Sequence, residues 1–298
     1  MKRFLINIAI FFAIVAVGDF SMGKVFHYLQ AHAGGRTGAE YYVCEKATED
    51  VIIMGSSRAS HHYVPEIISE KLGMSCFNAG QDGNGIILQY GRWKMLSERY
   101  TPKLIIYDIT SVFDVEVNDN MAYIDRLKPF CGDLMVKDYV SEVFPMEHFK
   151  TFSSMYCYNY KFIEMAFDYL RKGDYKSSGG YIPLNGHIRK EIISKAKTEK
   201  SHSIEMDSVK LFYLYQLVKE ARKKGSQVLL VVSPSWKGGN LAANAYSTIK
   251  AMAEEYRVQF VEYIDLEMCN NPDNFEDSSH LNDKGARAFT DNLLSVFL

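Results

Sequence analysis

Two short segments of this 298-residue chain contain residue types that can act together as a nucleophile and a base. In the first, MGSSR at 54–58, a pair of serines follows an apolar run. A serine in the turn between a strand and a helix presents its hydroxyl at the rim of a sheet. The backbone N–H at that helix start is free to stabilise an oxyanion. Serine is also a favoured helix cap, so the segment alone leaves both interpretations of Ser57 open.

The second segment lies near the C-terminus, where Asp277 precedes His280 by three residues. In a tight loop ahead of a helix, this spacing lets the carboxylate hold one imidazole nitrogen as N–H and leave the other free as a general base. Such a pair is poorly specific by itself. Its position after the last expected strand is where a partner for a strand-end serine would be needed.

A third segment, NAGQDGNG at 78–85, carries three glycines in six residues. Glycines permit close approach of the backbone to a ligand, although an ordinary flexible turn has the same composition. The segment spells neither a dinucleotide-binding fingerprint nor a P-loop.

Alternating strands and helices must position these segments. Apolar runs predict strands at 51–54, 74–77, 104–107, 227–232 and 259–261, and helical periodicity predicts helices at about 86–100, 205–224, 241–257 and 284–297. This pattern indicates an α/β fold, a three-layer, doubly wound, mainly parallel five-stranded sheet of flavodoxin-like type. Ligands bind at the carboxyl ends of such strands, so we expect Ser57, Gly83 and His280 to meet there.

The stretch from about 115 to 204 interrupts the alternation of strands and helices. It is rich in aromatic residues and mostly helical in pattern, with no expected strand. We expect a helical insertion between strands three and four that covers the active edge of the sheet. Aromatic rings there could cover the apolar C–H faces of a sugar.

The N-terminus resembles an export signal. Lys2 and Arg3 precede an apolar run from Phe4 to Val17. Residues 1–30 are therefore expected to form either a signal peptide, cleaved after the small-residue sequence at 16–18, or a membrane anchor. The anchor is favoured, with the two cations inside and the rest of the chain on the exported side. Residues 31–49 read as a linker, and 50–298 as one domain.

Composition limits the partners. Thirty-four Lys and Arg against 36 Asp and Glu give a net charge of -2, so nucleic acid is not expected as a partner. Five scattered cysteines form no CxxC pair, and no clustered set of metal ligands is present, so no metal and no other cofactor is expected.

Taken together, the motifs resemble those of the SGNH (GDSL-like) hydrolases. Gly55-Ser56-Ser57 resembles the Gly-Asp-Ser block of that family, and Asp277 to His280 resembles its final Asp-x-x-His block. Asn78 followed five residues later by Gly83 is similar to the second block. The resemblance implies that Ser57 is the nucleophile, His280 the base and Asp277 its orienting partner. The N–H groups of Ser57 and Gly83 would be oxyanion donors.

Two departures from the family pattern affect the expected site. Ser56 replaces the usual Asp of the first block, and the third block, normally Gly-x-Asn-Asp, reads DITS at 108–111. The third oxyanion donor is therefore Ser111, Asn84 or absent. Arg58, His61 and His62, which follow the nucleophile, are either substrate contacts or a polar helix start at the surface.

With these departures, the chain resembles more closely the anchored branch of the family, which modifies cell-envelope polymers, than its free lipases. The expected function is a serine acyl-ester hydrolase or O-acyltransferase acting on acylated carbohydrate or an envelope polymer. The alternative is a catalytically weak or inactive binding or assembly protein of the cell envelope, which the altered third block favours. Labelling of Ser57 by a covalent serine probe would separate the two.

Overall fold

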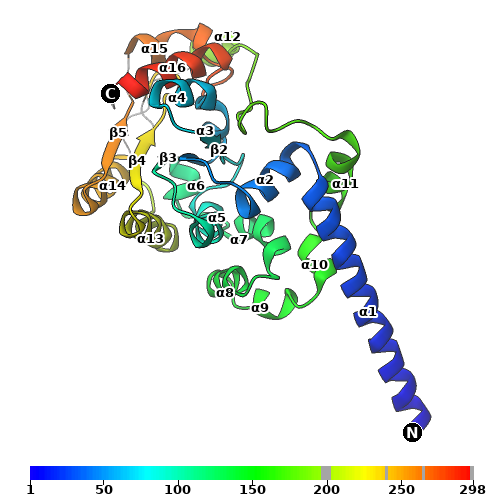
Figure 1. The fold of residues 1–298 in the computed structure, drawn as a ribbon. Coiled ribbons are helices and arrows are strands. Elements are labelled where there is room, and N and C mark those ends of the chain that lie inside the picture. Colours follow the sequence, from blue (N-terminus) through cyan, green and yellow to red (C-terminus); the bar gives the residue numbers. More distant parts are fainter. Residues whose placement is uncertain (196–202, 239–240, 264–265, 296–298) are drawn as a thin grey trace. The chain divides into compact units, whose positions relative to one another are not determined.

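The computed structural model describes residues 1–195, 203–238, 241–263 and 266–295 (Figure 1). The chain divides into two compact units, which are described separately. We call residues 43–120 and 175–298 the sheet unit, and residues 1–42 and 121–174 the N-terminal unit.

The sheet unit contains five parallel strands. They are β1 (Val51–Gly55), β2 (Cys76–Asn78), β3 (Leu104–Asp108), β4 (Gln227–Val232) and β5 (Gln259–Glu262), in the order β2-β1-β3-β4-β5. Every neighbouring pair is parallel, and the residues of β1 and β3 are fully buried. The predicted doubly wound α/β fold is confirmed, because apolar runs buried on both faces can only be central strands of a covered parallel sheet.

Helices cover both faces of this sheet. The first face carries α3 (Ser57–His62), α4 (Pro65–Leu72) and α16 (Asp283–Ser295), and the second carries α5 (Ile86–Arg99), α13 (Ser208–Lys224) and α14 (Ala243–Tyr256) (Figure 1). The unit also includes the short helices α6 (Ser111–Asp114), α12 (Lys190–Lys195), α15 (Leu266–Asn270) and the 3₁₀ helix η2 (Pro272–Asn274). Tyr63, Ile68 and Phe289 form a core against alternate residues of the strands.

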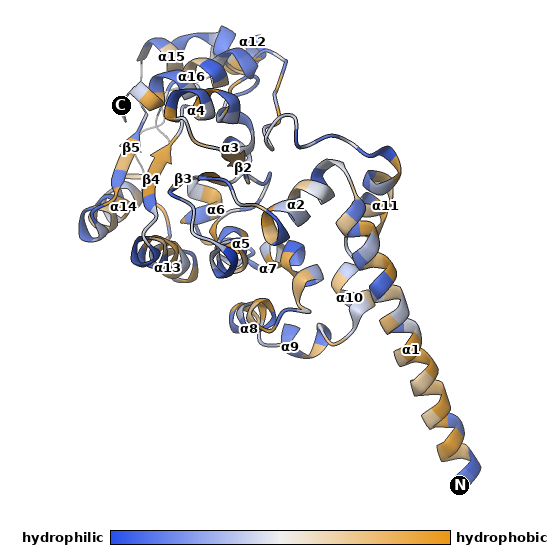
Figure 2. Cartoon of the chain, in the orientation of Figure 1, coloured by the Kyte–Doolittle hydropathy of each residue, from blue (hydrophilic) through white to orange (hydrophobic). Residues whose placement is uncertain are grey.

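The N-terminal unit is helical. It begins with α1 (Lys2–His32) and the start of α2 (Gly35–Glu45), and continues with α7 (Met121–Ile124), the 3₁₀ helix η1 (Asp125–Phe130), α8 (Leu134–Val143), α9 (Glu147–Lys150), α10 (Ser154–Tyr158) and α11 (Phe162–Arg171). The C-terminal part of α1 packs against α10 and α11. Its first half is strongly hydrophobic (Figure 2) and its large apolar side chains are exposed. Among the described residues, α1 is the one helix long and apolar enough to cross a membrane.

The expected boundaries differ from this division in two places. The segment 31–49, expected as a linker, contains α2. Of the expected insertion 115–204, residues 121–174 group with α1, while 175–195 belong to the sheet unit and 196–202 lie outside the described residues. The C-terminal half of α1, which includes the buried Gly23 and Gln30, provides a surface on which α10 and α11 pack. Coverage of the active edge by this segment remains a prediction.

Candidate active site

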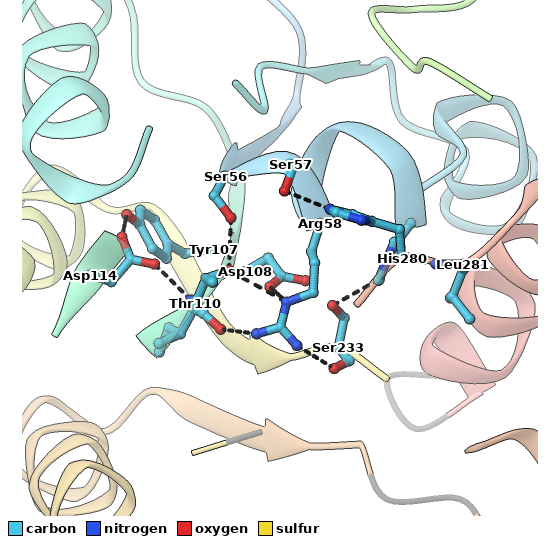
Figure 3. A network of polar contacts seen from close by, with 12 residues as sticks. Ser56, Ser57, Arg58, Tyr107, Asp108, Thr110, Asp114, Ser233, His280 and Leu281 are labelled. Carbon is cyan, nitrogen blue, oxygen red and sulfur yellow. Dashed lines mark hydrogen bonds and ion pairs between the residues drawn. The ribbon is translucent and has the colours of Figure 1, made fainter. Parts of the chain in front are cut away.

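The turn between β1 and α3 positions Ser57. β1 ends at Gly55, which has φ 139°, and a Cβ there would lie 2.6 Å from the carbonyl oxygen of Asp108 on the neighbouring strand. Only glycine allows this close approach at a positive φ. Ser56 is fully buried, and Ser57 starts α3 with its hydroxyl 2.8 Å from Nε2 of His280 (Figure 3).

The loop before α16 holds His280 from the opposite side. Nδ1 of His280 lies 2.9 Å from Oδ2 of Asp277, while Oδ1 of Asp277 accepts the backbone N–H groups of Ser279 at 2.7 Å and His280 at 2.9 Å. A carboxylate on Nδ1 favours the tautomer in which Nε2 is free to accept the Ser57 proton. The three side chains therefore form a continuous hydrogen-bonded chain across 223 residues of sequence.

The surroundings keep Asp277 ionised. Partial burial alone would raise the pKa of this carboxyl, but hydrogen bonds from the His280 ring and from the N–H groups of Ser279 and His280 outweigh it and lower the pKa to about 2. A negative charge next to Nδ1 stabilises the imidazolium that forms when His280 takes up a proton.

The turn after β2 is attached to the nucleophile turn. The Gln81 N–H donates to the carbonyl of Gly55 at 3.1 Å, and Oδ1 of Asp82 lies 3.2 Å from Nε2 of His61 on α3. Gly83 is exposed at the tip of this turn with φ 69°. Among the described residues, neither the Ser57 N–H nor the Gly83 N–H has a hydrogen-bond acceptor.

In the described part of the chain, no hydrogen bond joins Ser57 to either of the two residues expected as a third oxyanion donor. Asn84 is buried and its amide nitrogen donates to the carbonyl of Asp82 at 2.9 Å. Ser111 begins α6 and is half-buried. The residue of this loop that reaches the nucleophile turn is Thr110, whose Oγ1 lies 2.7 Å from Oγ of Ser56.

Arg58 lies in the interior instead of at the surface. Its side chain is 7% exposed, and its guanidinium donates to the backbone carbonyls of Ser233 at 3.0 Å and Ile109 at 3.2 Å. Arg58 is therefore not part of a polar helix start at the surface, and substrate contact by Arg58 remains a prediction. With its donors directed at these carbonyls, Arg58 ties the ends of β3 and β4 to α3 beneath the nucleophile.

His61 lies beside the general-base candidate, with its ring centroid 5.7 Å from that of His280. Both ring nitrogens have partners, since Nδ1 lies 2.7 Å from the carbonyl oxygen of Ile182 and Nε2 faces Asp82. The ring is 7% exposed. His61 therefore forms part of the wall next to His280, and substrate contact by His61 remains a prediction.

His62, expected as a substrate contact or as part of a polar helix start at the surface, is instead fully buried and contacts the residue after His280. Its Nε2 accepts the backbone N–H of Leu281 at 3.0 Å, and its Nδ1 therefore carries the proton toward Oγ of Ser233 at 2.9 Å. Burial lowers the pKa of His62 well below its usual range, and the charges of His280 and Arg58 act in the same direction. The neutral ring thus fixes the backbone next to His280.

Asp108 is a buried polar residue that sequence reasoning missed. It ends β3, accepts the hydroxyl of Tyr63 at 2.6 Å and lies 3.9 Å from Nε of Arg58 (Figure 3). Burial raises the pKa of Asp108, although the Arg58 charge opposes this shift. Asp108 and Ser233 both stand at the carboxyl end of a predicted strand, where ligand sites form in such sheets. This position in the sequence could have identified them as candidate site residues.

A metal site is not built among the described residues, where no group of three or more His, Cys, Asp and Glu side chains is placed to hold an ion. The five cysteines are free and buried.

No family model matches this chain, and no curated protein matches it. Among solved structures it is similar to a psychrotrophic esterase from a Pseudoalteromonas species, at 12% identity over 83% of this chain and 95% of that one, with a TM-score of 0.42. It is also similar to a GDSL-like lipase from Bacteroides thetaiotaomicron, at 11% identity over 83% of this chain and 88% of that one, with a TM-score of 0.38. A mutant acetyl-xylooligosaccharide esterase from Geobacillus is similar at 11% identity over 84% of this chain and 94% of that one, with a TM-score of 0.40.

Proposed function

We propose that this protein is a serine acyl-ester hydrolase or acyltransferase of the SGNH type, with Ser57 as its nucleophile. One observation carries the proposal: His280 contacts Ser57 through Nε2 at 2.8 Å and Asp277 through Nδ1 at 2.9 Å. These distances are within hydrogen-bond reach for a nucleophile, a base and an orienting carboxylate.

The reaction begins with proton transfer from Oγ of Ser57 to Nε2 of His280 as Oγ attacks the ester carbonyl carbon. The carbonyl oxygen becomes an oxyanion, and the imidazolium is stabilised by Asp277. His280 then returns the proton to the departing alcohol oxygen, which leaves an acyl group on Ser57. Water or a sugar hydroxyl, deprotonated by the same ring, attacks this acyl-enzyme and releases Ser57.

The N–H groups of Ser57 and Gly83 are the proposed oxyanion donors. Removing one such donor typically lowers kcat by about 100-fold or more, so a two-donor site is slower than a three-donor site. The absence of Asn from the 108–111 segment therefore favours a modest rate of acyl transfer.

The proposed substrate is an acylated carbohydrate or cell-envelope polymer on the exported side of a membrane. Support comes from α1, which is apolar enough to span a bilayer, and from Lys2 and Arg3, whose positive charge favours retention of that end inside. The sheet unit would then lie outside, where such polymers are found.

A fluorophosphonate probe tests the nucleophile. We expect covalent labelling of the full-length protein in detergent, loss of labelling in Ser57→Ala, and retention in the matched control Ser56→Ala, because Ser56 is buried against Thr110. If the parent protein is not labelled while its fold is intact, the protein is instead a binding or assembly protein that has lost catalysis.

A further inference from the structure

Asp19 ties the middle of α1 to the rest of the N-terminal unit. Its Oδ1 accepts the Ser153 hydroxyl at 2.6 Å and the Met155 N–H at 3.0 Å, and its Oδ2 accepts the Ser154 N–H at 2.7 Å. A Cβ on Gly23, one turn later in α1, would collide with the Ser154 side chain, so α10 lies directly on α1. The start of α10 is therefore held beside residues 19–23 of α1.

This position along α1 corresponds to the edge of a bilayer. Asp19 lies seventeen residues after Lys2, which is about 25 Å along a helix. The hydrocarbon core is about 30 Å thick. With Lys2 at the inner boundary, Asp19 and the residues bonded to it must lie near the outer boundary. The hydrogen bonds from 153–155 also offset the cost of placing a carboxylate there.

The segment from the residue before α9 to the start of α10 exposes four large apolar side chains. Met146, Phe149, Phe152 and Met155 follow one another at intervals of three residues and are 63%, 67%, 69% and 48% exposed. We call these four residues the interfacial row. Lys137 of α8 lies over the Phe152 ring, 3.4 Å from its centroid, and so adds a cation beside the row. Aromatic rings flanked by Lys are typical of the boundary between lipid headgroups and acyl chains.

We propose that the interfacial row inserts into the outer headgroup region of the bilayer that α1 crosses, so that the N-terminal unit rests on the membrane surface. The inference goes beyond the chemistry of the proposed function and rests only on the insertion of α1. The bilayer is the occupant because Asp19 holds residues 153–155, which contain or adjoin Phe152 and Met155 of the row, just beyond the apolar stretch from Phe4 to Val17.

Another exposed apolar position in the same unit provides a matched control. Leu170 of α11 is 74% exposed. α11 is attached near the end of α1, where the Gly34 N–H donates to the Asp168 carbonyl at 3.1 Å. The end of α1 is about 20 Å beyond Asp19, so Leu170 should stay in water. α11 also lies farther than α9 from the N-terminus of α1 in Figure 2.

The experiment measures tryptophan quenching by brominated lipids in full-length protein reconstituted in phosphatidylcholine vesicles. Phe12→Trp, Phe152→Trp and Leu170→Trp are compared with the parent, whose Trp93 and Trp236 are buried in the sheet unit. We expect the tryptophan fluorescence of Phe152→Trp to be quenched by lipids that carry bromine near the headgroup end of the acyl chain. Interfacial side chains insert only about 5–10 Å into the boundary between headgroups and acyl chains. Phe12→Trp should be quenched best by deep bromines, and Leu170→Trp should match the parent.

Each other outcome overturns the proposal in a distinguishable way. Quenching of Phe12→Trp without quenching of Phe152→Trp would show that α1 is inserted but that the interfacial row does not enter the bilayer. Equal quenching of Phe152→Trp and Leu170→Trp contradicts the depth assigned to the row from Asp19. Absence of quenching in Phe12→Trp shows that α1 is not inserted. Labelling of Ser57 by the fluorophosphonate probe reports separately on the proposed chemistry.

Discussion

Adjacent serines at the end of β1 occupy very different environments. Ser56 is fully buried and bonded to Thr110, whereas Ser57 is half-buried and bonded to His280. The difference arises because successive residues at a strand-to-helix turn point to opposite sides, one into the interior and one toward the rim. Ser57 is thus the serine available for chemistry, and Ser56 supports the turn.

Single substitutions in the hydrogen-bonded chain should have graded effects. Ser57→Ala and His280→Ala each remove a participant in bond formation and should lower kcat by about 10⁶, whereas Asp277→Ala should lower it by about 10⁴ because imidazole still acts as a base in some orientations. The measurement is burst release from a chromogenic acetyl ester by the full-length protein. Full activity in both Asp277→Ala and His280→Ala would show that the final motif is only a helix cap.

His62 should make the stability of the sheet unit sensitive to acid. A base whose pKa is lower in the folded protein than in the unfolded chain takes up a proton on unfolding, so acid favours the unfolded state. Its contribution is complete above the unfolded pKa of about 6.5 and falls below it by up to about 1.4 kcal/mol per pH unit.

Thermal unfolding of His62→Gln tests this dependence. The variant should have a lower Tm than the parent at about pH 8, but a smaller fall in Tm between about pH 8 and about pH 5. His148→Gln, which alters an exposed histidine, is the control and should keep the parent's pH dependence. An unchanged pH dependence in His62→Gln would show that the ring does not stay neutral in the fold.

At the scale of elements, the site depends on turns that follow parallel strands. β1 and β3 end in register, with Gly55 paired to Asp108, and the turn after β2 is attached to the carbonyl of Gly55. This register brings the β1, β2 and β3 turns to one edge of the sheet. The loop before α16 completes the site from the first face.

A pair of glycine substitutions separates turn geometry from general stability. Gly83 in the turn after β2 has φ 69° and Gly73 at the end of α4 has φ 63°, and a Cβ at either position meets no atom within 4 Å. Replacement by Ala should cost about 1 kcal/mol of stability at each. Only Gly83→Ala should also lower kcat, by about 10- to 100-fold, as the strained turn relaxes and moves the Gly83 N–H.

The Tm of each variant and its kcat for a chromogenic acetyl ester are measured side by side. Equal kcat in Gly83→Ala and Gly73→Ala, with equal loss of Tm, would exclude the Gly83 N–H as an oxyanion donor.

For the whole molecule, the two halves of α1 have different partners. The apolar side chains from Phe4 to Val17 are largely exposed, whereas Asp19, Gly23 and Gln30 contact α10. Buried Glu40 and Lys161 form a further ion pair inside the N-terminal unit. The exposed first half of α1 is therefore available for the membrane insertion proposed above, and the second half contributes to the fold of the N-terminal unit.

Two truncations should separate these roles. A chain that begins at Gly18 keeps the Asp19 contacts and should be released from membranes with its N-terminal unit folded. A chain that begins at about residue 31 loses these contacts and should be cut rapidly by protease within 121–174. Sedimentation of membranes and limited proteolysis measure both effects. Equal protease resistance of the two truncations would contradict a structural role for the second half of α1.

Features that depend on residues close together in the chain could be predicted from the sequence. Apolar runs predicted the five strands, because strands that are buried on both faces exclude polar side chains. The alternation of these strands with helices predicted that they pair in parallel. The spacing of Asp277 and His280 specified a local pair, and the apolar run after Lys2 specified the long N-terminal helix.

Contacts between residues far apart in the chain could not be predicted in this way. Arg58 lies against Ser233 across 175 residues and His62 against Leu281 across 219, and 121–174 groups with α1 instead of with the sheet unit. Periodicity reports whether a side chain is buried, but not what it is buried against. The partner of a buried polar group depends on which strand ends the crossovers bring to the same edge, and that is settled only when the whole sheet is assembled.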